Sequence, residues 1–452
     1  MTPSIQIDPS FPYYRQRSPD SIADELQLAG YRAVHIFVTN EFDVDAELVR
    51  ALHRCRLEVW ALTLGNGTFT TAHLPSGWEG WQMGLLKTVN DGYTRLSPFC
   101  PAYVAWKKQA LAALVRSIPF DGLHIAEPYL PEWGGLKSGT YGDVGAHAAA
   151  AFRRTYGAAI PEFRNRLSPR YYRKQPELYE AWVQFRVDGV NDYVDEIFNG
   201  CGGVREARPD IRIATWTLAV DDGPDSAAKL RELQGNDAVS MIAKVKPDLH
   251  YLQTHWPDWG RAALPAEYVR TYRPFVQAIR DAHPSLPIGI QTDIGSAKPM
   301  IRSRAWLEQF ARETGALGCS TWTAYEYHIG GALYDEAPRL MGARRLAGGG
   351  IELCFHKRIA SVHTNSTGSG LQLAARTGNV VRELFPAHVS SDGNRLILRG
   401  LDLPSGATHI GVKGTADTPE LLLFPPKRAN RTSVYEWASL DEHRTVCYTN
   451  RK

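Results

Sequence analysis

The chain has 452 residues, more than a single hydrophobic core usually fills, so we expect one large domain with an accessory unit, or two to three ordinary domains. Hydrophobic residues make up 44% and charged residues 22%, which is typical of a globular protein and argues against long disordered segments. The net charge of +3 is too weak to indicate a nucleic-acid partner, and no apolar run approaches the roughly 18–20 residues of a membrane span. We therefore expect neither nucleic acid nor membrane as a partner.

Eight short runs of β-branched and aromatic residues recur along the chain, and segments of helical periodicity lie between them. The runs are Ile5–Asp8, Ala33–Asn40, Leu57–Leu64, Gly122–Glu127, Ile211–Leu218, Leu249–His255, Ile288–Asp293 and Cys319–Glu326. The helical segments include Ser21–Ala29, whose first serine we interpret as the N-cap, Tyr103–Val115, Leu178–Phe198 and Val269–Ala282. Strand then helix, repeated eight times, predicts a parallel sheet closed into a (β/α)8 barrel. An open doubly wound sheet is the alternative, but no Gly-x-Gly-x-x-Gly follows the first run.

Two connections, residues 65–98 and 128–176, are much longer than the others. Both leave the carboxyl ends of predicted strands, the face where barrel enzymes place their sites. Both are rich in aromatic residues, namely Phe69, Trp78, Trp81, Tyr93, Tyr129, Trp133, Tyr141, Tyr171 and Tyr172. We expect these rings to form cleft walls, a use that sugars favour because one face of a sugar ring presents only C–H groups. The alternative is that the rings pack on one another as small subdomains.

The pattern changes after Gly348–Gly350, which we interpret as a hinge. The remaining residues show short strand-like runs with turn signals between them, namely Ile351–Phe355, Arg395–Arg399, His409–Lys413 and Glu420–Phe424. Ser391–Asn394 has the composition of a hairpin turn. We therefore predict a barrel domain at residues 1–345 and a β-sandwich-like domain at residues 346–452.

Most predicted barrel strands end in a polar residue, where a catalytic rim should lie. These residues are Asp8, Asn40, Glu127, Asp221 or Asp222, His255, Asp293 and Glu326. A carboxylate just past an apolar run is costly to leave half-buried unless it is paired or used. Several acids on one rim raise the pKa of at least one member, which is how a barrel obtains a general acid near neutral pH.

Glu127 is the strongest candidate. It ends the run that starts at Phe120, and strict alternation would point it the same way as Leu123 and Ile125. Pro128 then ends the strand and fixes the direction of the exit. The alternative interpretation is a glutamate that forms a salt bridge with an arginine on the rim.

The second carboxylate is either Asp293 or Glu326. Asp293 could instead cap the following loop, with Gly295 and Ser296, and Glu326 could instead be a partner of His328 or of a rim arginine. The remaining strand-end residues should contact the substrate, and we predict this role for Asp8, Asn40, Trp216, His255, Trp256, Gln291, Trp322 and Tyr325.

Two carboxylates and aromatic platforms are the minimal machinery of glycoside cleavage, in which one acid protonates the leaving oxygen and the other attacks carbon or activates water. A sugar lyase or isomerase could use the same acids for proton transfer, and a non-catalytic carbohydrate-binding barrel is a third possibility. Zinc spacing, a phosphate loop and a Gly-x-Ser-x-Gly elbow are absent from the sequence, so we expect neither a metal nor a cofactor.

The segment Phe120-Asp-Gly-Leu-His-Ile-Ala-Glu-Pro-Tyr129 resembles the fourth strand of clan A glycosidase barrels, and residues 1–345 resemble bacterial glycosyl hydrolases. Its Ala-Glu-Pro resembles the Asn-Glu-Pro of that clan, in which the glutamate is the acid/base, so the resemblance implies this role for Glu127. Two positions depart from the pattern. Ala126 stands where the clan has asparagine, and Asp293 on the seventh strand stands where the clan has a nucleophilic glutamate.

The N-terminus has neither a basic segment nor an apolar segment of the secretory type. The six cysteines lie far apart without a Cys-x-x-Cys pair, and we expect them to be reduced. We predict a cytoplasmic protein that acts on a carbohydrate, with a homo-oligomer as a possibility.

Overall fold

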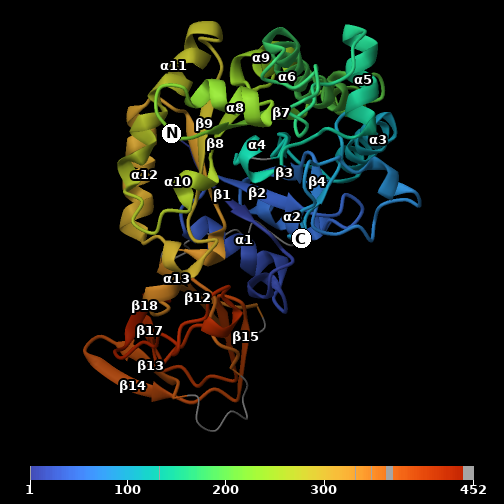
Figure 1. The fold of residues 1–452 in the computed structure, drawn as a ribbon. Coiled ribbons are helices and arrows are strands. Elements are labelled where there is room, and N and C mark those ends of the chain that lie inside the picture. The colour runs from blue at the N-terminus through green and yellow to red at the C-terminus, as the bar shows by residue number, and fades with distance from the viewer. Residues whose placement is uncertain (1, 132, 331, 348, 363–369, 441–452) are drawn as a thin grey trace.

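The computed structural model describes residues 2–131, 133–330, 332–347, 349–362 and 370–440. Eight parallel strands close into a barrel in the order β1-β10-β9-β8-β7-β6-β3-β2. Figure 1 shows this barrel domain with the C-terminal domain below it. The barrel strands are β1 (Thr2–Ile7), β2 (Ala33–Val38), β3 (Glu58–Leu64), β6 (Gly122–Ala126), β7 (Arg212–Ala219), β8 (Leu249–Thr254), β9 (Ile288–Asp293) and β10 (Thr321–Tyr325). Each of these strands overlaps one of the eight apolar runs, so the predicted (β/α)8 barrel is confirmed.

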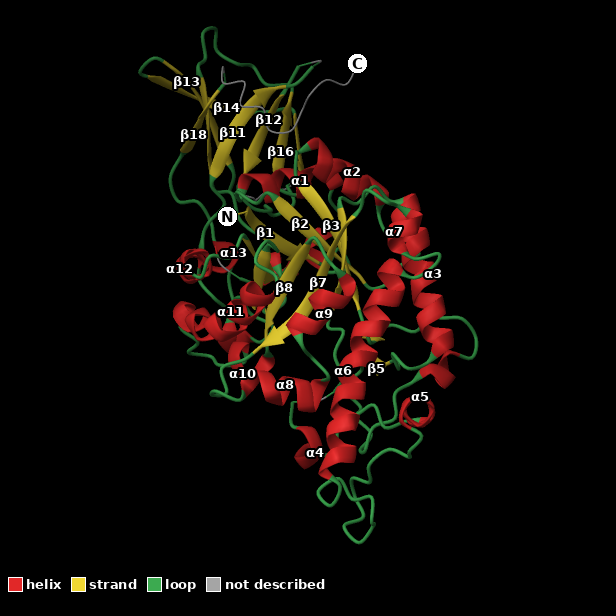
Figure 2. Ribbon diagram, turned by 90° about the horizontal axis from the view of Figure 1, so that it is seen from above, coloured by secondary structure: helices red, strands yellow, loops and turns green. Residues whose placement is uncertain are grey.

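Helices surround the barrel on its outer side (Figure 2). The main ones are α1 (Pro19–Leu28), α2 (Ala46–Arg54), α3 (Pro101–Ser117), α5 (Ala146–Tyr156), α6 (Pro176–Asn199), α8 (Ser226–Gln234), α9 (Ala238–Val245), α11 (Arg273–Ala282) and α12 (Arg304–Ala316). Single-turn helices are α4 (Gly135–Ser138), α7 (Val204–Ala207), α10 (Trp256–Trp259) and α13 (Ala332–Asp335). The predicted N-cap at Ser21 is wrong, because the Ser18 side chain accepts the Ser21 N–H and Pro19 supplies the first turn.

The interior of the barrel contains a directional chain of hydrogen bonds. Trp216 Nε1 donates to His124 Nδ1 at 2.5 Å, so the proton of His124 must lie on Nε2, which faces His35 Nδ1 at 3.0 Å. His35 then directs its own N–H at Ser4 Oγ, 3.0 Å away. Burial lowers the pKa of His35 to about 3 and that of His124 well below its usual value, so both rings are neutral. The chain therefore satisfies polar groups in the barrel core without a buried charge.

Two four-stranded antiparallel sheets form the C-terminal domain. One has the order β11-β12-β16-β15, from β11 (Leu340–Arg345), β12 (Ile351–Phe355), β16 (Arg395–Arg399) and β15 (His388–Asp392). The other has the order β14-β13-β17-β18, from β14 (Val380–Leu384), β13 (Gln372–Thr377), β17 (His409–Lys413) and β18 (Glu436–Ser439). Their facing apolar residues share one core. The predicted β-sandwich-like domain is confirmed, as is the hairpin turn between β15 and β16, where Gly393 has a φ of 58°.

Two details of the predicted C-terminal domain are wrong. Glu420–Phe424 is no strand, because Pro419–Leu421 forms a 3-10 helix and Leu422 packs into the barrel's main core. Gly349 and Gly350, predicted as part of an interdomain hinge, instead lie in the turn that connects β11 to the antiparallel β12, with φ values of 85° and 130°. Gly348 lies outside the described residues. Because β11 already belongs to this sheet, the C-terminal sheets begin before residue 346.

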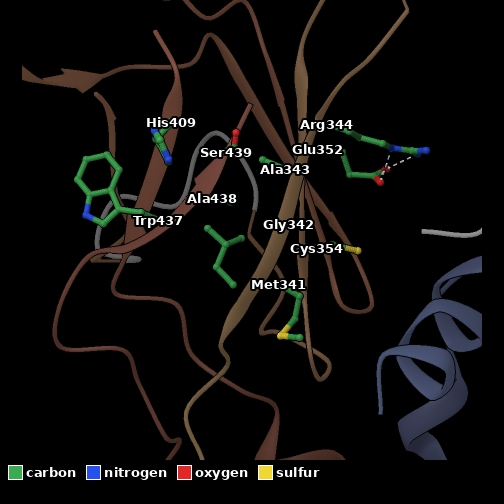
Figure 3. Close-up of a pocket in the computed structure, with 11 residues that line it drawn as sticks. Met341, Gly342, Ala343, Arg344, Glu352, Cys354, His409, Trp437, Ala438 and Ser439 are labelled. Carbon is green, nitrogen blue, oxygen red and sulfur yellow. Dashed lines mark hydrogen bonds and ion pairs between the residues drawn. The ribbon is translucent and has the colours of Figure 1, made fainter. Parts of the chain in front are cut away.

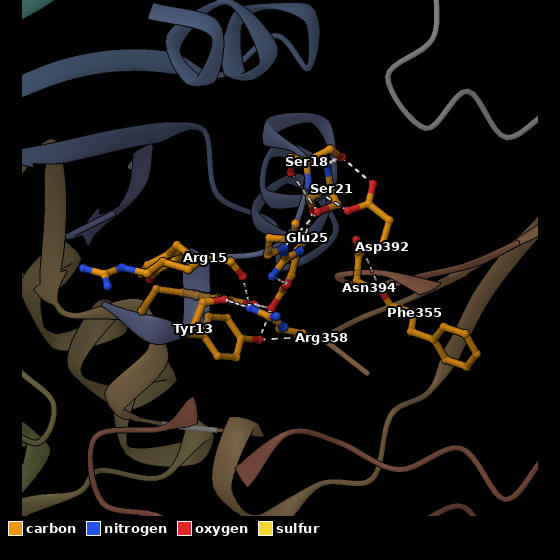
Figure 4. A network of polar contacts seen from close by, with 12 residues as sticks. Tyr13, Arg15, Ser18, Ser21, Glu25, Phe355, Arg358, Asp392 and Asn394 are labelled. Carbon is orange, nitrogen blue, oxygen red and sulfur yellow. Dashed lines mark hydrogen bonds and ion pairs between the residues drawn. The ribbon is translucent and has the colours of Figure 1, made fainter. Parts of the chain in front are cut away.

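Buried polar contacts join the C-terminal domain to the start of the barrel (Figure 4). The Arg358 guanidinium donates to the carbonyls of Pro12, Tyr13 and Arg15, the last at 2.8 Å, and its side chain is buried. Asp392 Oδ1 accepts the Ser18 N–H at 2.7 Å, just at the start of α1. These carbonyls and amides have few other partners, so the contacts fix the segment that leads from β1 to α1.

Of the cysteines that the structure describes, Cys100, Cys201, Cys319 and Cys354 are free, whereas Cys55 is disulfide-bonded. The prediction of reduced cysteines is therefore wrong at Cys55, and Cys447 lies outside the described residues. Within the described part of the chain, none of the helices combines the length and the apolar character needed to cross a membrane.

The Arg358 contact predicts a stability effect. Arg358→Met keeps much of the side-chain volume but leaves the carbonyls of Tyr13 and Arg15 without this donor, so we expect the free energy of unfolding to fall by about 1–3 kcal/mol in urea titrations. Arg399→Met, at an exposed position on β16, is the matched control and should change stability by less than about 0.5 kcal/mol. Equal effects of the two substitutions would contradict the role given to Arg358.

Candidate functional site

A pocket of about 180 Å³ lies at the carboxyl ends of the barrel strands, next to Glu127. We call it the Glu127 pocket. Its lining consists of amide, aromatic and charged side chains and two apolar residues: Asn66, Met83, Tyr93, Arg95, Glu127, Tyr129, Pro131, Gln234, His255 and Trp256. The lining therefore includes three residues predicted from strand ends, namely Glu127, His255 and Trp256.

Glu127 lies at the exit of β6 in a left-handed backbone conformation, with a φ of 55°. Leu123 and Ile125 belong to the core between barrel and helices, so an unbroken strand would have pointed Glu127 toward the helices as well. The carboxylate instead accepts a hydrogen bond of 3.2 Å from Gln253 Nε2, on the same face of β8 as the interior residue Tyr251. The prediction that Glu127 shares a face with Leu123 and Ile125 is thus wrong, because the positive φ turns its side chain into the barrel mouth.

The surroundings of Glu127 favour its protonated form. Burial raises the pKa of the carboxyl above its usual value, while hydrogen bonds from Gln253 and Tyr129 oppose this shift without cancelling it. The predicted alternative, an ion pair with a rim arginine, is not found among the described residues: Arg95 lines the same pocket, but its guanidinium is 2.7 Å from Asp91. A partly buried carboxyl with a raised pKa can act as a general acid.

Several buried polar atoms at the barrel mouth have no hydrogen-bond partner among the described residues. In the Glu127 pocket they are Asn66 Oδ1, Gln234 Oε1 and His255 Nε2, and on the inner strand faces nearby they are Gln253 Oε1 and Gln291 Oε1. Burial also lowers the pKa of His255 to about 3, so this ring is neutral and has one donor or acceptor to offer. Unpaired buried amides and imidazoles are costly, and a hydroxyl-rich ligand would satisfy them.

Asp293 ends β9 and caps the loop that follows, as its alternative interpretation predicted. Its Oδ1 accepts the N–H groups of Gly295 and Ser296, both at 2.8 Å, and its Oδ2 accepts the Ser296 hydroxyl. The side chain is 7% exposed, and burial raises its pKa although these hydrogen bonds lower it. The carboxyl is therefore held in one orientation at the rim.

Glu326 ends β10 and is fully enclosed. Its Oε1 accepts the Tyr14 hydroxyl and both the backbone N–H and the ring Nδ1 of His328, the last two at 2.9 Å and 2.8 Å. Its Oε2 accepts the Asp8 N–H at 2.7 Å. The predicted pairing with His328 is thus present. With no exposed surface, Glu326 joins the ends of β1 and β10 and leaves its carboxylate no face for a substrate.

The acids of the rim converge on the phenol of Tyr325. Burial is the main cause of its raised pKa, and the charges of Glu326, Asp8, Asp293 and Glu127 add to the increase in that order. The pKa of Tyr325 is therefore raised by carboxyls from the ends of four strands, β1, β6, β9 and β10. Asp8 itself is partly buried, and burial raises its pKa as well.

Of the residues predicted to contact substrate, Trp322 and Trp216 lie away from the Glu127 pocket, and Asn40 does not line it. Trp322 points outward from β10 and packs against Tyr31 and Phe310, with ring centroids 6.2 Å and 6.1 Å away. Trp216 is 2% exposed and belongs to the hydrogen-bond chain inside the barrel. Asn40 accepts the Phe42 N–H at 3.0 Å within its own loop. Gln291, by contrast, lies on the inner face of β9, where it is 5% exposed.

Some rings of the two long aromatic connections line the cleft, as predicted, and others pack on one another, as the alternative predicted. Tyr93 and Tyr129 line the Glu127 pocket, and the Trp133 ring lies 5.3 Å from that of His255. Tyr141, in contrast, is fully buried with Trp182, whose Nε1 donates to its hydroxyl at 2.8 Å. The rings nearest the barrel form cleft walls, and those farther out form a small separate core.

Three polar residues of the site, Asn66, Gln234 and Gln253, are not among those predicted from the sequence. Gln253 lies two residues before His255 on β8, so alternation alone would have put it on the inner face. Asn66 follows β3 directly, apart from Gly65, and fits the same strand-end rule that selected Glu127. Gln234 is the last residue of α8, and nothing in the local sequence distinguishes it.

Another pocket, of about 270 Å³, lies in the C-terminal domain between β11–β12 and β17–β18 (Figure 3). Trp437 and His409 lie on one side of it, and Arg344 and Glu352 form an ion pair of 2.8 Å on the other. This pocket is remote from the ends of the barrel strands, where the acids converge. We therefore take the Glu127 pocket as the candidate active site.

The different environments of the two acids predict different effects on stability. Glu326→Gln places an NH₂ group among four hydrogen-bond donors, so we expect the free energy of unfolding to fall by about 1–3 kcal/mol. Asp293→Asn keeps the oxygen that caps the loop and serves as the matched control, with a smaller loss. Urea titrations followed by tryptophan fluorescence make this comparison, and a greater loss in Asp293→Asn would contradict these assignments.

No protein family model and no curated protein matches the chain. Among solved structures, a GH42 β-galactosidase from G. stearothermophilus is 12% identical with a TM-score of 0.51, over 73% of this chain and 51% of that chain. The catalytic domain of a β-amylase from Paenibacillus polymyxa is 11% identical with a TM-score of 0.47, over 72% and 92%. At such identities the likeness concerns the fold alone. The chain thus has a glycoside-hydrolase-like (β/α)8 barrel fold.

Proposed function

We propose that the protein is a glycoside hydrolase that acts on a small glycoside or oligosaccharide, with Glu127 as the general acid. The observation that carries this proposal is the Glu127 carboxyl itself, which is turned into the barrel mouth, where burial raises its pKa. Protonation of a leaving glycosidic oxygen needs a carboxylic acid whose pKa lies above that of a free glutamate. The resemblance of Ala126-Glu127-Pro128 to a clan A acid/base motif supports the same role.

The lining of the Glu127 pocket supports a sugar as the ligand. Sugars present many hydroxyl groups and one apolar ring face, so they bind where amides and aromatic rings meet. The unpaired atoms of Asn66, Gln234 and His255 offer partners for hydroxyl groups. Trp256, which is 50% exposed, offers an apolar face at the pocket entrance.

For the second carboxylate we propose Asp293 rather than Glu326. Asp293 retains some exposure at the rim, whereas Glu326 has none. Asp293 also ends the seventh barrel strand, the position from which clan A enzymes supply their nucleophile. Three hydrogen bonds from Gly295 and Ser296 would orient it, with a shorter reach than a glutamate has.

A carbohydrate-binding barrel without activity is the second candidate. It is favoured by the same hydrogen bonds, because both Asp293 and Glu326 already have protein donors on their carboxylates. The two candidates differ in their products: a hydrolase incorporates solvent oxygen into the released sugar, while a binding protein returns the ligand unchanged. A lyase or isomerase, the remaining alternative, would give an unsaturated or rearranged sugar.

The direct test is a panel of 4-nitrophenyl glycosides and short oligosaccharides. Glu127→Gln should lower kcat by about 10²–10⁴-fold without a change in melting temperature, because an amide cannot donate the proton. Glu79→Gln, at an exposed position in the same long aromatic connection that contributes Tyr93, is the matched control and should keep full activity. Near-normal turnover by Glu127→Gln, or binding of sugars by the wild type without any turnover, would contradict the proposal.

Asp293→Asn tests the second carboxylate. Because asparagine retains the loop-capping oxygen, the variant should stay folded while kcat falls by at least about 10²-fold. An Asp293→Asn variant with full activity would exclude Asp293 from the reaction.

The pH profile tests the acid role independently. A general acid must be protonated, so kcat/KM should fall as pH rises through the pKa of Glu127. Gln253 donates to the carboxylate and lowers that pKa, so Gln253→Leu should raise it and move the alkaline limb to higher pH. Gln291→Leu, the same substitution on the neighbouring strand β9, is the control and should leave the limb in place. A limb that moves to lower pH in Gln253→Leu would contradict this account.

A further inference from the structure

A pocket larger than the two above lies between the end of β7 and the helices α8, α9 and α11, which Figure 2 shows near one another beside β7 and β8. Its volume is about 470 Å³, and it shares no lining residue with the Glu127 pocket. The floor consists of Leu218, Val220, Leu230 and Ile279, none more than 2% exposed. An apolar cavity of this size is typical of a small-molecule site.

One polar group in this cavity lacks a partner. Asn236 is 3% exposed, and its Oδ1 accepts the Leu218 N–H at 2.8 Å. Its Nδ2 has no hydrogen-bond partner among the described residues. Of the charged side chains in the lining, Arg231 and Asp237 pair with each other, while Asp221 lies at an exposed position. The buried part of the cavity therefore offers an apolar surface and one buried amide donor.

We propose that this cavity, the Asn236 pocket, binds a small uncharged apolar molecule through one hydrogen-bond acceptor, which meets Asn236 Nδ2. A charged or hydroxyl-rich ligand would lose its hydration here without enough partners to replace it. A sugar is thus matched to the Glu127 pocket and an apolar molecule to the Asn236 pocket.

Two aromatic side chains separate the pockets. Tyr129 and Trp133 pack against Leu218, Val220 and Leu230 on the side of the Asn236 pocket. Both rings also contact His255, with centroid distances of 6.4 Å and 5.3 Å, and His255 lines the Glu127 pocket. The second site is therefore distinct from the candidate active site, and its test does not depend on catalysis.

Two probes of similar shape test the proposal by calorimetric or NMR titration. Acetophenone has an aromatic ring and one carbonyl acceptor, whereas ethylbenzene has the ring without the acceptor. We expect acetophenone to bind about threefold to tenfold more tightly, the gain of one hydrogen bond to a buried donor. Equal affinities, or no binding of acetophenone, would overturn the proposal.

Variants locate the probe. Ala278→Phe fills the cavity from an exposed position on α11 and should abolish binding, while Gln277→Phe, the adjacent exposed residue outside the lining, should not. Ala227→Phe on α8 blocks the cavity independently if Ala278→Phe does not fold. Asn236→Asp keeps the acceptor for Leu218 but removes the donor, so the preference for acetophenone should disappear. Unchanged binding in both blocked variants, or loss of binding in Trp256→Ala of the Glu127 pocket, would overturn the assignment.

Discussion

The candidate site depends on the backbone conformation of one residue, Glu127. A left-handed conformation costs a residue with a side chain about 1–2 kcal/mol, and such strain persists where the surrounding structure holds it. Here Pro128 follows directly, and Gln253 and Tyr129 hold the carboxylate from two sides. Without the turn, the strand would direct this carboxyl toward the helices. With it, the carboxyl lies in the barrel mouth, where burial raises its pKa.

The rest of the barrel supports that mouth from below and from the side. Below it, the chain from Trp216 through His124 and His35 to Ser4 fills the interior with neutral, directional hydrogen bonds. Beside it, Glu326 binds the end of β1 to the end of β10. The C-terminal domain holds the β1–α1 segment through Arg358, so it stabilises the part of the barrel that carries Asp8 and Tyr14. Sites built on rigid elements hold their reacting groups most accurately.

Much of the fold could be predicted from the sequence because it depends on local patterns. Eight β-branched runs with helices between them are sufficient to indicate the barrel, and the Gly393 turn to indicate a hairpin. Apolar runs are ambiguous when tertiary contacts compete: Glu420–Phe424 looks like a strand, but Leu422 packs on the barrel core instead. The direction of side chains within a strand also depends on a local pattern, the alternation of inner and outer faces. Trp322 stands three positions before Tyr325 on β10, an odd spacing. Alternation therefore directs it to the outer face of the strand, where it packs against Phe310.

The roles of the rim acids could not be predicted, because they depend on contacts distant in sequence. Glu326 is enclosed by Tyr14 and Asp8, which are separated from it by 312 and 318 positions. The direction of Glu127 was mispredicted because alternation assumes an unbroken strand. Position at a strand end nevertheless indicated Glu127 and His255 among the polar residues and Trp256 among the aromatic ones, and all three line one pocket. The sequence therefore indicates where the site lies better than it indicates the role of each residue in the site.

The most direct test of the central claim is a ¹³C NMR titration of the Glu127 carboxyl in protein with labelled glutamate. The Glu127→Gln variant assigns the signal by its absence. Burial in the barrel mouth predicts a titration midpoint above the ordinary value of about 4.5. A midpoint at or below 4.5 would mean that the carboxyl is ionised like an exposed glutamate, and it would contradict the assignment of Glu127 as a general acid.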